Sequence, residues 1–313
     1  MLAEVVRSGF VESRHRGHLV VVEPDGGVCL SFGDPEQAFF PRSSNKPLQT
    51  VAMLELGLDA SSDLLAVACA SHAGLPMHVD AVRRLLASAG LTEADLDNTP
   101  DLPLDTEAAR SLLAAGGGLD RLHQNCSGNH AAMLATCVAQ SWPTAGYRDP
   151  AHPLQVAVRE TYKKLSRTTI GAAAVDGCGA PLYAMSLVGL ARAYSALVSR
   201  AATTSAQRVA AAMAAHPELV DGPGRAASGL MMAVPGLIAK GGAEGMYGVG
   251  LPDGRALALK IDDGAARACV PVIVAVLREL GVSNAELDRW ATGPVFGHGE
   301  VVGEVRATLP ATR

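Results

Sequence analysis

The sequence predicts an α+β protein, in which an antiparallel sheet built from both ends of the chain is packed by helices. Strand-like segments lie near the N-terminus, helix-period segments fill the middle, and strand-like segments return toward the C-terminus. This order predicts a sheet with covering helices from residues 1–40 and 233–313. A mainly helical insert is expected over residues 41–232, with an active site at the junction of the two parts.

The N-terminal strands are predicted from apolar runs at Val5–Val6 and Leu19–Val22. A Pro24-Asp-Gly-Gly turn separates the second run from Val28–Phe32, and glycine readily adopts the positive φ that tight hairpins require. The runs on either side of this turn are therefore expected to pair as a hairpin. Because the simplest packing joins both chain ends in one sheet, Leu19–Val22 and Leu257–Ile261 are expected in the same layer.

The middle of the chain predicts helices, because apolar residues recur at helical spacing between recognisable ends. Glycine follows several of these segments, and proline lies in the first turn of others, which is where helices best tolerate these two residues. The expected helices span residues 47–56, 77–89, 106–115, 127–140, 153–165, 181–198 and 205–215.

Strand character returns over Leu237–Ile261, where Pro252-Asp-Gly marks another hairpin turn. A helix is expected over residues 265–280, with a kink at Pro271 because proline removes a helical hydrogen bond. A last strand is expected near residues 299–308.

Composition excludes several classes of protein. The chain has 313 residues, of which 49% are hydrophobic and 18% charged, a balance that excludes general disorder. The net charge of −5 is spread without a basic run, so no nucleic-acid partner is expected. Residues 1–7 lack the apolar core of a signal peptide, and the apolar run 269–277 is too short to span a bilayer, so we expect a cytoplasmic protein without membrane contact. Six cysteines without CxxC spacing indicate neither a disulfide framework nor a zinc ribbon.

The stretch with the clearest chemical content is a Ser-x-x-Lys pair, Ser43 and Lys46, at the start of the apolar segment 47–56. This spacing places two side chains next to each other on one helical turn. A serine hydroxyl needs an adjacent base to act as a nucleophile, and a partly deprotonated lysine can serve. In the alternative interpretation, Ser43 and Ser44 only cap the helix and Lys46 is solvated.

Polar residues also occur where a packed core does not require them. Ser71 and His72 lie between an apolar run and a glycine, and form either a loop that presents two hydrogen-bonding groups or a turn that caps the next element. Lys260 follows Ala256 and Ala258 on one face of an alternating strand. It points either to water or into a pocket, and periodicity alone leaves both open.

Two cysteine-containing stretches have the same ambiguity. Cys126 and Asn129 share one face near the start of the predicted helix 127–140, which suits either a ligand or metal site or a capped helix with a buried cysteine. Asp176 and Cys178 lie in a glycine-rich turn, which either permits the close approach of a ligand or simply reverses the chain.

Together these stretches resemble the rhizobial-type L-asparaginases, also called the thermolabile asparaginase II family. The matching segments are residues 42–49, 70–74, 125–134, 176–181 and 251–264. That family is similar in architecture to the serine β-lactamases and penicillin-binding proteins, which place a Ser-x-x-Lys motif on the first helix of a helical part beside an antiparallel sheet. The resemblance therefore implies a serine β-lactamase-like α+β fold and a homodimer.

The resemblance also implies roles for individual residues. These are Ser43 with Lys46 and Ser71 with Lys260 as two catalytic pairs, His72 and Asp176 near the substrate, and Cys126, Asn129 and Cys178 around a zinc ion. The family has a lysine at the position of Asn129. Because a neutral amide is a weaker zinc ligand than an amine or thiolate, zinc binding is expected to be weakened here. No organic cofactor is implied.

The reaction that follows from this resemblance is hydrolysis of the side-chain amide of L-asparagine to L-aspartate and ammonia. Ser43 is the first choice of nucleophile, with Lys46 as its base, and attack by Ser71 fits the sequence nearly as well.

Free asparagine carries a carboxylate and an ammonium group. Arg42 or Lys260 suits the carboxylate, and Asp176 suits the ammonium group.

Two other functions stay open at this point. One is another Ser-Lys hydrolase, such as a glutaminase, β-lactamase or esterase, and the other is a non-catalytic relative that binds an amino acid or a metal.

Overall fold

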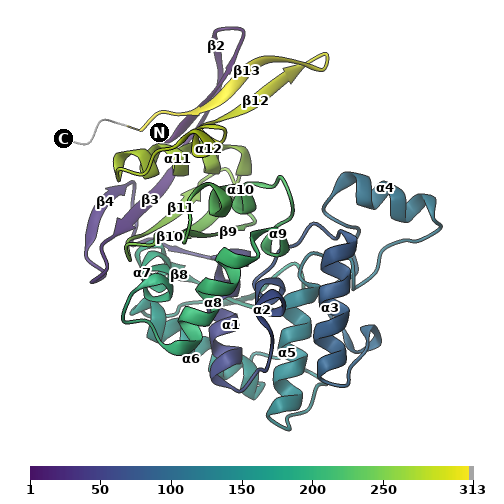
Figure 1. The fold of residues 1–313 in the computed structure, drawn as a ribbon. Coiled ribbons are helices and arrows are strands. Elements are labelled where there is room, and N and C mark those ends of the chain that lie inside the picture. Colours follow the sequence, from purple (N-terminus) through teal and green to yellow (C-terminus); the bar gives the residue numbers. More distant parts are fainter. Residues whose placement is uncertain (310–313) are drawn as a thin grey trace.

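The computed structural model describes residues 1–309, and its fold confirms the predicted α+β class (Figure 1). Antiparallel strands from both ends of the chain lie in one part of the molecule, and helices from the middle of the chain form the other. Among the residues described, no helix is long and apolar enough to cross a membrane.

A five-stranded antiparallel sheet forms the centre, in the order β4-β3-β11-β10-β9. Its strands are β3 (Gly17–Val22), β4 (Val28–Phe32), β9 (Ile238–Gly242), β10 (Met246–Gly250) and β11 (Ala256–Ile261). Leu19 pairs with Leu259, which confirms that segments from the two chain ends share a layer. Both predicted hairpins form, because β3 pairs with β4 and β10 pairs with β11.

The expectation of a single sheet is wrong, because the first and last strands form a second antiparallel sheet, in the order β12-β13-β1-β2. Its strands are β1 (Ala3–Arg7), β2 (Phe10–His15), β12 (Thr292–Gly297) and β13 (Glu300–Ala307). The chain passes from β2 into β3 through Arg16 alone. Gly17 permits this crossing, since a Cβ at that position would lie 2.2 Å from the carbonyl oxygen of Lys260.

Six of the predicted helices lie within one residue of their expected bounds. They are α1 (Lys46–Glu55), α3 (Pro76–Ser88), α4 (Thr106–Ala114), α5 (Ser127–Ala139), α6 (Pro153–Ser166) and α8 (Thr204–Ala215). The sequence does not predict four shorter helices, whose few residues give little periodic signal. These are α2 (Ser62–Ala68), α9 (Pro217–Val220), α10 (Ala226–Ala233) and α12 (Ala285–Asp288).

The helix expected over residues 181–198 begins later than predicted, because its first residues form short strands. The elements concerned are β7 (Pro181–Tyr183), which pairs with β6 (Ala173–Val175), and β8 (Met185–Ser186), which pairs with β5 (Ala38–Phe39). Helix α7 (Leu187–Val198) starts where the side chain of Ser186 accepts a hydrogen bond from the amide of Gly189. A serine cap therefore sets this boundary instead of Pro181.

Helices cover the central sheet on both faces (Figure 1). Helix α7 packs against β3, β10 and β11, and the ring of Tyr194 comes so close to Gly248 that a Cβ there would meet it at 2.3 Å. Helix α11 (Cys269–Glu279) contacts β11 and also β12 and β13, so it lies between the two sheets. Pro271 lies in its first turn, where the missing N–H breaks no helical bond, and the helix continues through it.

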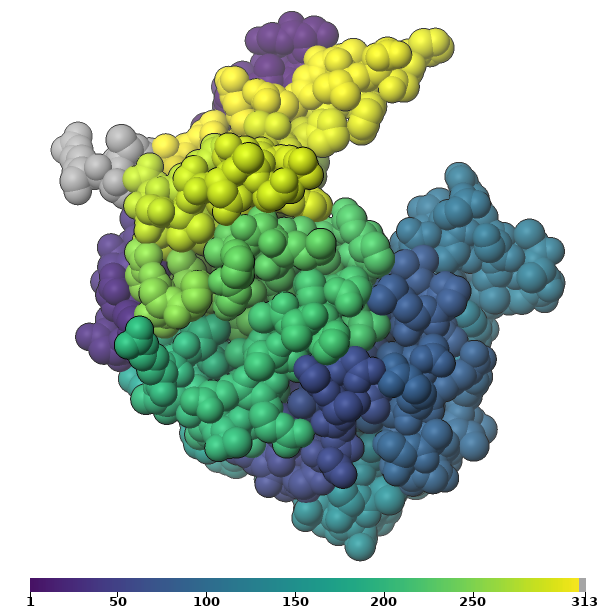
Figure 2. All heavy atoms as spheres, viewed as in Figure 1, coloured from purple at the N-terminus to yellow at the C-terminus, as the bar shows by residue number. Residues whose placement is uncertain are grey.

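Two parts project from the compact body, namely the four-stranded sheet and α4, and Figure 2 shows a hollow between them. None of the residues of α4 is buried. Leu104, which precedes α4, and Cys269, at the start of α11, both line a cavity at the base of this hollow.

Candidate active site

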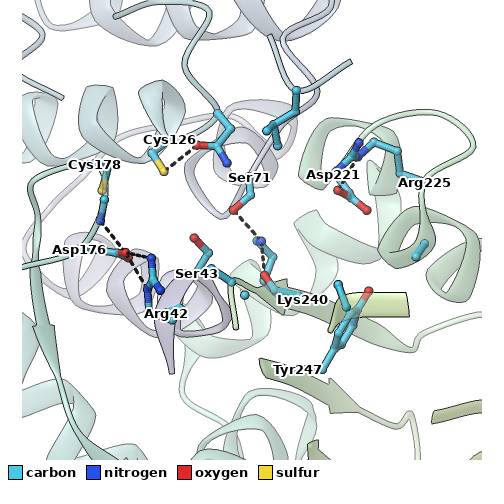
Figure 3. A pocket seen from close by; sticks show the side chains of 18 of the residues that line it. Arg42, Ser43, Ser71, Cys126, Asp176, Cys178, Asp221, Arg225, Lys240 and Tyr247 are labelled. Carbon is cyan, nitrogen blue, oxygen red and sulfur yellow. Dashed lines mark hydrogen bonds and ion pairs between the residues drawn. The ribbon is translucent and has the colours of Figure 1, made fainter. Parts of the chain in front are cut away.

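A cavity of about 610 Å³ lies where the central sheet meets the helical part (Figure 3). The polar side chains that line it are Arg42, Ser43, Ser71, Thr99, Asp101, Gln124, Asn125, Asp176, Asp221, Arg225, Lys240 and Tyr247, together with the thiols of Cys126, Cys178 and Cys269. Segments that are far apart in the sequence, around residues 43, 71, 126 and 176, therefore meet at one place.

Ser43 is placed by the 3-10 helix η1 (Arg42–Asn45), which leads directly into α1. The hydroxyl of Tyr194 donates to the carbonyl of Ser44 over 2.7 Å, and the hydroxyl of Ser44 donates to the carbonyl of Pro41 over 2.6 Å. These buried bonds fix the turn. The hydroxyl of Ser43 faces the cavity, and within residues 1–309 it has no hydrogen-bond partner (Figure 3).

Ser71 lies between two lysines. Its Oγ atom is 3.2 Å from Nζ of Lys46 and 2.9 Å from Nζ of Lys240. Lys46 also donates to the carbonyl of Ala70 over 2.5 Å, and Lys240 to the carbonyl of Gly241 over 2.7 Å. The serine hydroxyl therefore connects the two amines, and a proton can pass between them through it.

Lys240 is 2% exposed, and burial is the main reason why its pKa falls to about 7. The positive charge of Lys46 is the second cause, because a like charge disfavours protonation of a neighbouring amine. An amine with this pKa is partly uncharged at neutral pH and can accept a proton. The site therefore contains a base suited to acyl transfer.

The pairing of Ser71 with Lys260 is a wrong prediction, since Lys240 occupies that place. Lys260 lies on the sheet face predicted by alternation, but its Nζ donates to the carbonyls of Glu244 and Ile261. It lies near the end of β11, where it pairs with Met246, while Lys240 lies on the edge strand β9. A lysine that follows an apolar run and precedes two glycines is the sequence signal that could have identified Lys240.

Arg42 and Asp176 form an ion pair on the cavity wall (Figure 3). Both Nε and Nη2 of Arg42 lie 2.8 Å from Oδ1 of Asp176, and the amide of Gly177 donates to the same oxygen over 2.8 Å. Oδ2 of Asp176 has no partner in the part of the chain that is described. The pair thus presents a negatively charged oxygen to a ligand.

His72 is fully buried and does not line the cavity. Its Nδ1 accepts from the amide of Gly74 over 3.2 Å, so Nε2 carries the proton and donates to Ser127 over 2.8 Å. Burial, together with the charge of His78, holds the pKa of His72 well below its usual range. A neutral ring that links two chain segments supports the loop of Ser71 from behind.

The residues around Cys126 do not fit a complete zinc site. Cys126 and Cys178 lie side by side, and the interaction of the two sulfur groups lowers the pKa of Cys126 and raises that of Cys178. The thiol of Cys126 donates to Oδ1 of Asn125 over 3.1 Å. Nδ2 of Asn129 donates to the carbonyl of Ala68 over 2.9 Å. Within residues 1–309, no group of three or more His, Cys, Asp or Glu side chains is arranged to hold a metal ion. Two protein ligands are fewer than the three or four that zinc sites in proteins provide.

We therefore expect the purified protein to contain substoichiometric zinc, and Asn129→Lys to raise both the zinc content and its dependence on pH, because an amine ligand must lose a proton. Elemental analysis after gel filtration measures this. Cys178→Ala should remove the residual zinc, while Cys137→Ala, which changes a buried cysteine on α5, should not. Stoichiometric zinc that resists a chelator would contradict the prediction.

Sequence interpretation also misses the pair Asp221 and Arg225, which lines the cavity across from Arg42 and Asp176 (Figure 3). The segment Asp-Gly-Pro-Gly-Arg that contains it has the composition of an ordinary surface turn. Only its position beside Ser71 in the folded protein distinguishes this segment from an ordinary turn.

The chain matches the family model described as L-asparaginase II over residues 3–307. No curated protein sequence matches it. Among solved structures, a β-lactamase from Mycobacterium bovis is 18% identical, with 85% of this chain and 95% of that chain covered and a TM-score of 0.48. Mglu in its native form is 16% identical, with 85% and 65% covered and a TM-score of 0.40, so the chain spans less than two thirds of that protein.

Proposed function

The chain belongs to the L-asparaginase II family, and from this membership we propose that it hydrolyses the side-chain amide of L-asparagine to L-aspartate and ammonia. The observation that carries the proposal is the contact of Ser71 with two buried lysines, Lys46 and Lys240, beside the open hydroxyl of Ser43. Hydrolysis of an unactivated amide needs a nucleophile, a base and a proton donor for the departing nitrogen. These four residues supply all three.

Ser43 is the nucleophile in this proposal. Its Oγ forms a bond to the amide carbon while its proton passes to Lys46, and Lys46 passes its own proton through Ser71 to the uncharged amine of Lys240. The carbon–nitrogen bond then breaks, and the nitrogen leaves as ammonia with that proton. Water attacks the resulting ester, which releases aspartate and restores the Ser43 hydroxyl. Ser71 relays protons between Lys46 and Lys240, so that the pair can accept one proton and return it.

The choice of Ser43 over Ser71 rests on their surroundings. Ser43 is half-buried and faces the cavity without a partner in the part of the chain described, whereas Ser71 is 9% exposed and contacts both lysines. A nucleophile must reach the substrate, and a relay must contact its donors and acceptors. Backbone N–H groups of the 3-10 turn at Ser43 and of the edge strand β9 are the candidate donors to the oxyanion.

The ion pair of Arg42 and Asp176 provides the recognition of a free amino acid. Oδ1 of Asp176 is held by Arg42, and Oδ2 is available to the ammonium group of asparagine. The Nη1 group of Arg42 is available to its carboxylate, since Nε and Nη2 are used by Asp176. Lys260 has no part in this recognition, because its amine is bound to main-chain carbonyls.

Release of ammonia tests the proposal directly. We expect the purified protein to release ammonia from L-asparagine, and not from L-glutamine, whose longer side chain would move the amide away from Ser43. Cleavage of a chromogenic β-lactam would instead identify a different Ser-Lys hydrolase. Tight binding of asparagine in a calorimeter without turnover would identify a non-catalytic relative.

A further inference from the structure

A second charged pair, Asp221 and Arg225, lies on the opposite side of Ser71 and Lys240 from Arg42 and Asp176 (Figure 3). Nε of Arg225 donates to Oδ1 of Asp221 over 2.9 Å. The amide of Ala227 donates to Oδ2 of Asp221 over 3.1 Å. The carboxylate of Asp221 is therefore used at both oxygens, and its role is to hold the arginine.

The segment that carries this pair is fixed to the loop of Ser71. The amide of Ser71 donates to the carbonyl of Val220 over 3.0 Å, next to Asp221. Gly222 has a φ of +142°, and a Cβ there would lie 2.8 Å both from Cβ of Ala73 and from Cδ of Arg225. Only glycine allows this approach, so the backbone is built to place Arg225 beside the Ser71 loop.

Arg225 has hydrogen-bond donors that no described residue engages. Asp221 engages only its Nε, and within residues 1–309 neither Nη group has a hydrogen-bond partner. The side chain is 38% exposed, so these groups are open to the cavity and to solvent. A guanidinium edge with two free N–H groups matches a carboxylate, which can accept both bonds at once.

The chemistry of the proposed reaction decides which end of a substrate faces Arg225. The departing nitrogen must receive its proton from the lysines, and Ser71 and Lys240 lie between Ser43 and the Asp221–Arg225 pair (Figure 3). Arg42 and Asp176 are on the acyl side. A substituent on the nitrogen therefore extends toward Arg225. The cavity of about 610 Å³ is larger than one free amino acid needs.

We propose that this protein also hydrolyses β-aspartyl amides whose departing amine carries a carboxylate, and that Arg225 binds that carboxylate while Asp221 positions Arg225. This assignment rests on the proposed function, because it uses the same acyl side and the same Ser43 ester. The carbon–nitrogen bond breaks, the amine leaves with the proton that Ser43 gave up, and water releases aspartate. A β-aspartyl dipeptide that ends in glycine is the smallest such substrate.

The experiment compares three substrates by the release of aspartate. These are L-asparagine, β-aspartyl-glycine and β-aspartyl-glycinamide, which has the length of the dipeptide without its carboxylate. For the unmodified protein we expect kcat/KM to be at least about 10-fold higher for the dipeptide than for its amide, since charge-assisted hydrogen bonds are among the stronger ones. Arg225→Ala should remove this preference. Arg225→Lys, which keeps the charge without the fork, should retain part of it.

Arg84→Ala is the matched control, because Arg84 pairs with Asp80 at the same i, i+4 spacing on the exposed face of α3 and should leave the preference unchanged. Thermal unfolding of each variant verifies that it is folded. Turnover of asparagine without any turnover of the dipeptide would overturn the assignment alone, as would a preference that survives in Arg225→Ala. Failure of the unmodified protein on both substrates would overturn the proposed function as well.

Discussion

Replacement of Ser43 by alanine is expected to lower kcat for asparagine hydrolysis on the order of 10⁴-fold, because the nucleophile is lost. Lys46→Ala should have a similar effect, since a serine without its base is a poor nucleophile. The double replacement should be little worse than either single one, as found for residues that act as a unit. Ammonia release under saturating asparagine measures all three.

The control for these variants is Ser88→Ala, which removes a serine hydroxyl on α3 whose only hydrogen-bond partner among residues 1–309 is the carbonyl of Leu85. Its kcat should remain near that of the unmodified protein. If Ser43→Ala kept normal turnover while Ser71→Ala lost it, Ser71 would be the nucleophile. Acid quenching followed by mass spectrometry of the peptides would then locate the aspartyl ester on Ser71.

Lys240→Ala is expected to lower kcat/KM by about 10³-fold, within the range of general acid–base catalysis, whereas Lys260→Ala should change it less than about threefold. The two lysines share a sheet face, so this comparison isolates the contact with Ser71. The uncharged amine accepts the proton, and the pKa of Lys240 is about 7. The kcat/KM of the unmodified protein should therefore rise with pH through about 7 and level off above it.

The measurement is a pH profile of kcat/KM, which reports groups of the free enzyme. A profile that is flat between pH 6 and about 8 would contradict the role of Lys240, as would a Lys260→Ala variant that loses as much activity as Lys240→Ala. The thermal unfolding of both variants should also be measured, because Lys240 is buried and its replacement by alanine leaves a cavity that lowers stability.

Most of the fold could be predicted because its signals are local. Proline lies in the first turn of α1, α3 and α6, glycine follows α1 and α3, and the Pro-Asp-Gly turns mark both hairpins, so periodicity and turn chemistry are sufficient there. The division into two sheets is not a local property. It depends on the close approach of Gly17 to Lys260 after the crossing and on the packing of α11 between the sheets, and both are tertiary contacts.

The residues of the candidate site likewise include some that local sequence predicts and others that depend on tertiary contacts. Ser43, Lys46 and Ser71 lie in motifs whose residue types carry their chemistry, and the structure brings them together. Lys240 and Lys260 cannot be told apart by alternation, because both face the helical part. The difference is the order of strands, which puts β9 at the edge beside η1 and β11 at the centre. Arg225 could not be predicted for a related reason, since its turn becomes part of the candidate site only by its tertiary contact with the loop of Ser71.

The pairing of β3 with β11 has a consequence for how the protein is made. Leu19 can pair with Leu259 only after that later residue has been synthesised. The same holds for the contact of Ser71 with Lys240, which is 169 residues further along the chain. A chain emerging from the ribosome can form its helices early, because their contacts are local. The central sheet is complete only after β11 has been synthesised, so the nascent chain has no assembled candidate site until most of its length has been made. During that interval the edge of β3 that later pairs with β11 has no partner, and an unpaired strand edge favours aggregation.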